Sequence, residues 1–186
     1  MPVPGQNLGV HNSQPASILM FMRNARIAIA VASVMLLAGF LNAQQKPFSQ
    51  DQVSEKLREL YPDNADAKKE IAAALQSAQK DHKRVLLVFG ANWCFDCFAL
   101  DYRFHQPDIQ PLVDKNYHVV HVDIGRNDKN TDLVKKYNIP IEKGIPSLAV
   151  LDPSGNPLHT TGEFESARRI DPQVIVKFLE TWKPAA

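Results

Sequence analysis

The sequence has few of the features that mark several classes of protein. Only two of its 186 residues are cysteine, so it is not a scaffold held together by many disulfides. Basic and acidic residues nearly balance, with 21 Lys and Arg against 20 Asp and Glu, and no run of five like charges occurs. We therefore expect no nucleic-acid partner. A hydrophobic fraction of 45% is enough for one core, which argues against intrinsic disorder and a coiled coil.

Acidic residues are absent from residues 1–43, whose only basic residues are Arg23 and Arg26. An uncharged apolar run of fifteen residues follows, from Ile27 to Leu41, and a short polar stretch ends in Ala43. This is the layout of a secretory signal peptide. The run is shorter than the roughly 20 residues that a membrane-spanning helix needs. We expect residues 1–43 to be a signal peptide cleaved after Ala43, and the protein to be exported to the periplasm or secreted.

The same segment allows a second interpretation, in which it is retained as a membrane anchor and the rest of the chain faces the extracytoplasmic side. Only in this case do we expect a membrane partner. Met22 precedes both arginines and is an alternative start, which would make residues 1–21 an N-terminal extension. In either interpretation the remainder works in a compartment where disulfides form and persist.

The pattern of apolar residues predicts a linker and short leading helix over 44–65, then one domain over 66–183. Helices are expected at 66–80, 95–105, 108–115, 130–137 and 172–182, and strands at 85–89, 117–124, 147–151 and 158–161. The first strand, VLLVF, is continuously apolar, as is typical of a strand covered on both faces. This order of elements predicts an α/β domain with helices on both faces of the sheet.

Both cysteines lie in the sequence WCFDC, where the first buried strand gives way to a helix. Free backbone N–H groups and the positive end of the helix dipole stabilise a thiolate at the first turn of a helix. Cys94 is therefore the expected attacking thiol. Cys97, one turn further along, is placed to displace the mixed disulfide and release the substrate. The reversible disulfide carries the two electrons, so no metal or organic cofactor is implied.

Other interpretations of the pair fit the pattern less well. A structural disulfide that closes only two intervening residues would stabilise the fold little. A zinc site would need His118 and His121, but residues three apart on a strand point to opposite faces. A buried pair with no redox function fits poorly with a position at a strand-to-helix turn.

Taken together, these motifs resemble the thioredoxin-like family over about 66–183. The matching parts are VLLVFGANW, WCFDC, HVVHVDI and the sequence GIPS, which matches the family's cis-proline loop. The resemblance implies a three-layer sandwich, with a central mixed sheet and helices on both faces, and thiol–disulfide oxidoreductase activity. It also implies that Ile145 and Pro146 line a substrate groove, where the backbone before the proline pairs with an extended peptide. Trp93 is expected to shield the reactive sulfur and to contribute to this surface.

Two features depart from the family. Val88 stands where many thioredoxins carry a buried carboxylate that helps to move the second thiol's proton, so this role is vacant or passes to another group. Phe95 and Asp96 replace the Gly-Pro between the cysteines. Asp96 either repels the thiolate, raising its pKa and favouring the reducing direction, or is a solvated charge that favours the helix dipole. Phe95 adds apolar area that suits unfolded or extended protein substrates.

We therefore expect an exported thiol–disulfide oxidoreductase that acts on protein or peptide disulfides, in reduction or interchange rather than oxidation. A redox partner protein would supply or accept the electrons. The alternative is a peptide-binding module of the same fold with a redox-idle disulfide, which the missing carboxylate favours. Asp101, four residues after Cys97 on the same helical face, either takes a proton from it or is simply solvated.

Overall fold

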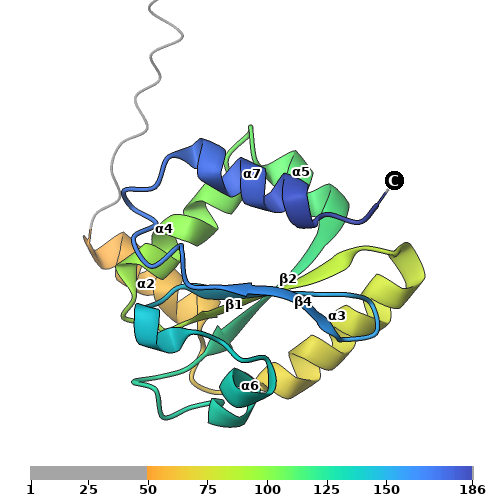
Figure 1. Cartoon of the computed structure of the whole chain (residues 1–186). Helices are drawn as coiled ribbons and strands as arrows, with labels where there is room; N and C mark the ends of the chain where they lie inside the picture. Colours follow the sequence, from red (N-terminus) through yellow and green to blue (C-terminus); the bar gives the residue numbers. More distant parts are fainter. Residues whose placement is uncertain (1–49, 186) are drawn as a thin grey trace, which may run out of the picture. The chain divides into compact units, whose positions relative to one another are not determined.

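The structure, a computed structural model, describes residues 50–185. Its helices are α2 (Gln50–Leu60), α3 (Ala67–Asp81), α4 (Phe95–Phe104), α5 (Gln110–Asn116), α6 (Thr131–Lys136) and α7 (Pro172–Trp182), with a short 3-10 helix, η1 (Ile141–Lys143) (Figure 1). Its strands are β1 (Arg84–Gly90), β2 (Tyr117–Asp123), β3 (Ser147–Leu151) and β4 (Pro157–Thr161). The expected signal peptide at 1–43, with the alternative start at Met22, lies outside the described residues. Within 50–185, no helix is long and apolar enough to cross a membrane.

The four strands form one mixed sheet in the order β2-β1-β3-β4. β1 runs parallel to β2 and antiparallel to β3, and β3 and β4 form an antiparallel hairpin. Asp152 holds the hairpin turn, because its Oδ1 accepts hydrogen bonds from the backbone N–H groups of Ser154 and Asn156, both at 2.9 Å. The pairing places β1, and with it the strand-to-helix turn that carries the cysteines, inside the sheet.

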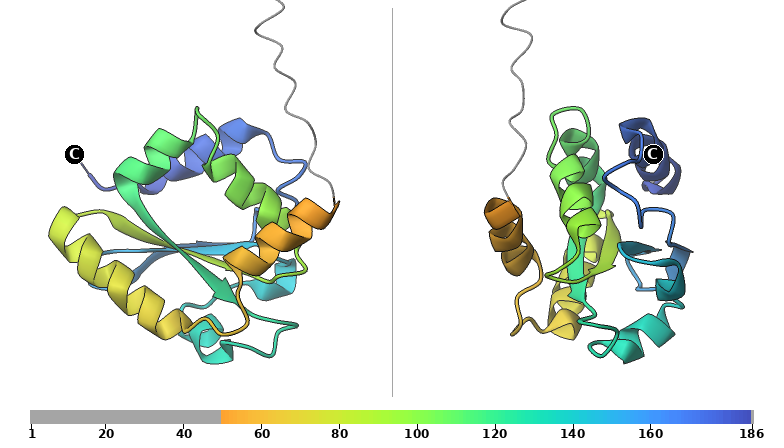
Figure 2. Two further views of the ribbon diagram at one scale, coloured as in Figure 1. Left: turned by 180° about the vertical axis from the view of Figure 1, so that it is seen from behind. Right: turned by 90° about the vertical axis from the view of Figure 1, so that its left-hand side faces the viewer.

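Helices cover both faces of the sheet, as Figures 1 and 2 show. Successive residues of β1 point to opposite faces. Val85, Leu87 and Phe89 enter the core under α3 and α6, whereas Leu86 and Val88 enter the core under α4, α5 and α7. All five are at most 1% exposed, which explains the continuous apolar run. The predicted α/β three-layer sandwich with a central mixed sheet is confirmed.

The leading helix α2 packs against α4, at the side of the sheet (Figure 2). Val53 and Leu57 are buried on its inner face, and Tyr61 follows directly after the helix. These three residues form a small apolar cluster with Cys94 and Cys97. The segment before residue 66 therefore contributes part of the environment of the cysteine pair.

Candidate active site

The turn between β1 and α4 places the cysteines at the start of a helix. Cys94 is the N-cap residue of α4, and its Sγ accepts a hydrogen bond from the backbone N–H of Cys97 at 3.1 Å. The two cysteines form a disulfide, with their Cα atoms 5.2 Å apart. Cys97 is completely buried and Cys94 is 5% exposed. Cys94 is thus the sulfur nearer to solvent, which is what an attacking role requires.

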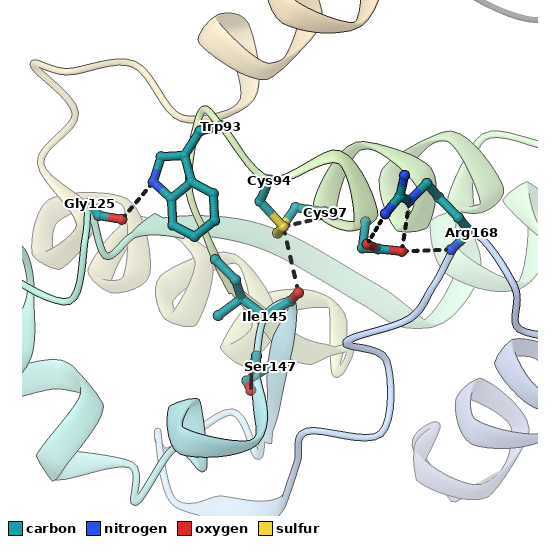
Figure 3. The surroundings of a disulfide bond; sticks show 9 residues. Trp93, Cys94, Cys97, Gly125, Ile145, Ser147 and Arg168 are labelled. Atoms are coloured by element: carbon teal, nitrogen blue, oxygen red, sulfur yellow. Dashed lines mark hydrogen bonds and ion pairs between the residues drawn. A yellow bond between two sulfur atoms is a disulfide. The ribbon is translucent and has the colours of Figure 1, made fainter.

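The loop before β3 lies against this disulfide. The Ile145–Pro146 peptide bond is cis, as the sequence predicts. Figure 3 shows the carbonyl group of Ile145 directed at the disulfide, and its oxygen lies 3.6 Å from Cys94 Sγ. Gly144 has φ 122°, a conformation that favours glycine, and the hydroxyl of Ser147 donates to its carbonyl oxygen at 2.8 Å. The loop is therefore held in place, and its backbone faces the sulfur that would react.

Trp93 and Phe95 give the cysteine pair an exposed apolar border. Trp93 is 44% exposed and Phe95 is 36% exposed. The indole Nε1 of Trp93 donates to the carbonyl oxygen of Gly125 at 2.9 Å, and the guanidinium of Arg126 lies 5.5 Å from the ring centroid. These contacts fix the orientation of the indole without removing it from solvent, so the ring can contact a bound substrate.

Asp96 is paired with Arg168, a partner that the sequence did not indicate. Asp96 Oδ1 accepts from the backbone N–H of Arg168 at 3.0 Å and from its Nε at 3.2 Å, and Oδ2 accepts from Nη2 at 3.0 Å. The side chain of Asp96 is only 17% exposed, so it is not the solvated charge that one interpretation expected. The hydrogen bond with Asp96 raises the pKa of Arg168. In Figure 3 the guanidinium lies on the opposite side of the disulfide from Trp93. Its positive charge compensates the Asp96 carboxylate, which would otherwise repel a thiolate.

A second group of polar side chains lies behind Cys97, from three different elements. Tyr61 follows α2 and is 1% exposed, and its hydroxyl has no hydrogen-bond partner among the described residues. Its ring meets that of His121, on β2, edge to face at 5.3 Å between centroids. His121 Nε2 lies 3.4 Å from Asp101 Oδ1, on α4. Asp101 is only 15% exposed, so it is not simply solvated as one interpretation expected.

Val88 and the two histidines of β2, His118 and His121, lie in different surroundings. Val88 lies in the apolar core beneath α4. His118 contacts Asp81 at 2.9 Å, whereas His121 contacts Asp101, on a different helix. The two imidazoles therefore point to opposite faces of β2, as the alternation of a strand requires. In the part of the chain that the structure describes, no group of three or more His, Cys, Asp or Glu could hold a metal ion.

Comparison with known proteins identifies the family. A thioredoxin-like family model matches residues 66–153. The structure of a disulphide isomerase from Xylella fastidiosa Temecula1 is 39% identical, covers 65% of this chain and 94% of that chain, and gives a TM-score of 0.62. The reduced C-terminal domain of DsbD from Neisseria meningitidis is 23% identical, with 62% of this chain and 96% of that chain covered and a TM-score of 0.48. No curated protein matches the sequence. With this identity over almost the whole of the Xylella protein, and with a CxxC disulfide at the start of a helix, the chain belongs to the thioredoxin-like family and is a thiol–disulfide oxidoreductase.

Proposed function

We propose that this protein is an exported enzyme that reduces or rearranges disulfide bonds in other proteins. Cys94 attacks a substrate disulfide and forms a mixed disulfide, and Cys97 then attacks Cys94 Sγ and releases the substrate thiol. The product is the Cys94–Cys97 disulfide that the structure contains. The observation that carries the proposal is this disulfide at the N-terminus of α4, with the carbonyl oxygen of Ile145 at 3.6 Å from Cys94 Sγ.

The surroundings of Cys94 support an extended polypeptide as the substrate. Trp93 and Phe95 offer exposed apolar surface beside the sulfur. The backbone of Ile145, before the cis bond to Pro146, faces the same sulfur and can pair with a peptide as a short added strand. Backbone pairing is independent of the substrate's sequence, which suits an enzyme that acts on many proteins.

We propose that the enzyme catalyses disulfide interchange or reduction rather than oxidation. The Xylella relative, 39% identical, is a disulphide isomerase. Repulsion of the thiolate by Asp96 is a weaker argument for the reducing direction, because Arg168 compensates the carboxylate. Net reduction leaves the pair as a disulfide, so it requires a redox partner protein that returns the pair to the dithiol form after each turnover. Interchange transfers no net electrons and requires this partner only when Cys97 has resolved the mixed disulfide. Equilibration of the full chain with glutathione buffers measures the direction: we expect a reduction potential between about −180 and −270 mV, and a value near −120 mV would instead indicate an oxidant.

Export rests on residues 1–43, with two arginines, an apolar run of fifteen residues and no acidic residue. We propose that cleavage after Ala43 releases the enzyme, so that the intact mass of the exported protein corresponds to a chain that starts at Gln44. A mass that still includes the apolar run would instead support the membrane anchor.

The attacking and resolving roles can be tested by trapping. In the Cys97→Ser variant, Cys94 can form a mixed disulfide but nothing resolves it, so we expect substrate proteins to remain covalently bound and to be released by a reducing agent. The Cys94→Ser variant is the matched control and should trap far less, because Cys97 is completely buried. A chain that keeps its partners after both cysteines are changed to serine would be a peptide-binding module, and the proposed function would be wrong.

A further inference from the structure

Cys97 must lose a proton before it can attack the mixed disulfide, yet its surroundings oppose this. The residue is completely buried, and burial disfavours a thiolate. Its neighbours in the cluster at the end of α2 are apolar apart from Tyr61. Val88, on the strand beneath α4, offers only an apolar side chain to this region. Some other group must therefore stabilise the Cys97 thiolate.

Tyr61 brings a polar side chain close to this sulfur. A Cβ added to Gly90 would lie 2.3 Å from Tyr61 Oη and 2.8 Å from Cys97 Sγ. Both atoms therefore approach the backbone of Gly90, which is possible only because this residue has no side chain. Gly90 is two residues beyond Val88, and so faces the same side of the sheet. Tyr61 thus approaches Cys97 from the end of α2. It does so beside Gly90, on the same side of the sheet as Val88, where many thioredoxins carry the buried carboxylate.

The hydroxyl of Tyr61 lacks an acceptor in the disulfide form. Its Oη is buried with no hydrogen-bond partner among residues 53–185, and such a group costs free energy until it is paired. A disulfide sulfur carries no charge, whereas a thiolate is a strong acceptor. Opening the disulfide therefore provides the partner that the hydroxyl lacks.

Burial and nearby carboxylates keep Tyr61 protonated, and so able to donate. Burial, with the carboxylates of Asp101 on α4 and Asp123 on β2, raises the pKa of Tyr61 well above its ordinary value. Asp123 is itself paired with Lys129 at 2.7 Å, and Asp101 lies 3.4 Å from the His121 imidazole, whose ring contacts Tyr61 edge to face. These neighbours fix the ring and oppose a phenolate at every pH at which thiols react.

We propose that Tyr61 donates a hydrogen bond to the Cys97 thiolate and thereby promotes the resolving step, with His121 and Asp101 as positioning residues. The proposal rests on the resolving role of Cys97 in the proposed function. In that step the Cys97–Cys94 S–S bond forms, the bond between Cys94 and the substrate sulfur breaks, and the electron pair leaves with the substrate thiolate. The proton that Cys97 loses balances the proton that the released thiolate gains. Tyr61 keeps its own proton throughout.

The test compares Tyr61→Phe with Tyr137→Phe. Both changes remove one buried hydroxyl that has no hydrogen-bond partner among the described residues, and both keep the ring. Tyr137 belongs to the core on the other face of the sheet, so its variant controls for the loss of a buried hydroxyl alone. Each change is made in the full chain carrying Cys94→Ser, where Cys97 is the only thiol and its titration is followed by the ultraviolet absorbance of the thiolate.

We expect Tyr61→Phe to raise the pKa of Cys97 by about one unit or more, the effect of one hydrogen bond to a charged group. Tyr137→Phe should leave the titration unchanged. In the chain with both cysteines, Tyr61→Phe should slow release of the mixed disulfide about tenfold at neutral pH, without slowing its formation. The proposal would be overturned if the two tyrosine variants shifted the pKa of Cys97 equally, or if neither variant shifted it. A Cys97→Ser chain that traps no substrate as a mixed disulfide would instead contradict the proposed function, and the titration would still test Tyr61.

Discussion

Arg168 determines the net charge beside the cysteine pair. Its guanidinium and its backbone N–H both bind the Asp96 carboxylate, which lies in the first turn of α4 between the two cysteines. An uncompensated carboxylate in this place repels a thiolate, whereas the ion pair leaves the helix dipole to favour it. The reactivity of Cys94 therefore depends on Arg168, a residue 72 positions beyond Asp96 in the chain.

We expect Arg168→Gln to raise the pKa of Cys94 in the reduced protein by about half a unit, because Asp96 then faces the thiolate without its counter-charge. Thiolate absorbance in a Cys97→Ser background measures this shift. Arg169→Gln is the matched control, because the Arg169 guanidinium contacts Ser166 and not Asp96. Asp96→Asn combined with Arg168→Gln should return the pKa close to its original value, and a shift that persists in this double variant would contradict the explanation.

Local sequence motifs predicted the residues that lie beside the disulfide. Trp93, Cys94 and Cys97 all lie in the single motif WCFDC. The GIPS sequence predicted the cis bond at Pro146. Tyr61 and Arg168 could not be predicted in this way, because their positions depend on how α2 and the segment before α7 pack onto α4. The available signal was indirect: Val88 at a position that is often acidic indicates that another group must act on Cys97.

At the scale of elements, the predicted helices and strands agree with the structure to within about two residues. Three of them show a local cause. The run VLLVF is buried on both faces, Asp66 caps α3 by accepting from the backbone N–H of Lys69, and Asp171 with Pro172 begins α7. The 3-10 helix η1 was not predicted, since three residues are too few for a periodic pattern to be recognised.

Sequence periodicity gives the buried face of an element but not its neighbour. The spacing of Val53 and Leu57 predicted a leading helix, and both side chains are buried. That this helix packs on α4 beside the cysteines depends on the angle of the chain after Tyr61, which no short-range signal specifies. The same limit explains why Asp101 could not be assigned from its place on α4: its neighbours His121 and Tyr61 come from two other elements.

At the scale of the whole molecule, the domain has a core on each face of its sheet and a third, smaller cluster around the cysteines. The two large cores fix β1 and the start of α4. The third cluster depends on α2, the first helix of the described residues. Burial of Cys97 therefore requires that α2 stay in place, and the reactivity of the buried thiol is coupled to the stability of this helix.

We expect Leu57→Ala in the full chain to lower the free energy of global unfolding by about 2–5 kcal/mol, because Leu57 is 1% exposed and a buried leucine is replaced by a cavity. Urea denaturation measures this change. Leu158→Ala, at a 39% exposed position of β4, is the control and should cost less than about 1 kcal/mol. If α2 instead opened independently of the domain, the urea midpoint of Leu57→Ala would stay unchanged while Cys97 in the reduced native protein reacted faster with an alkylating agent. That pattern would contradict the view that α2 is an integral part of the active-site domain.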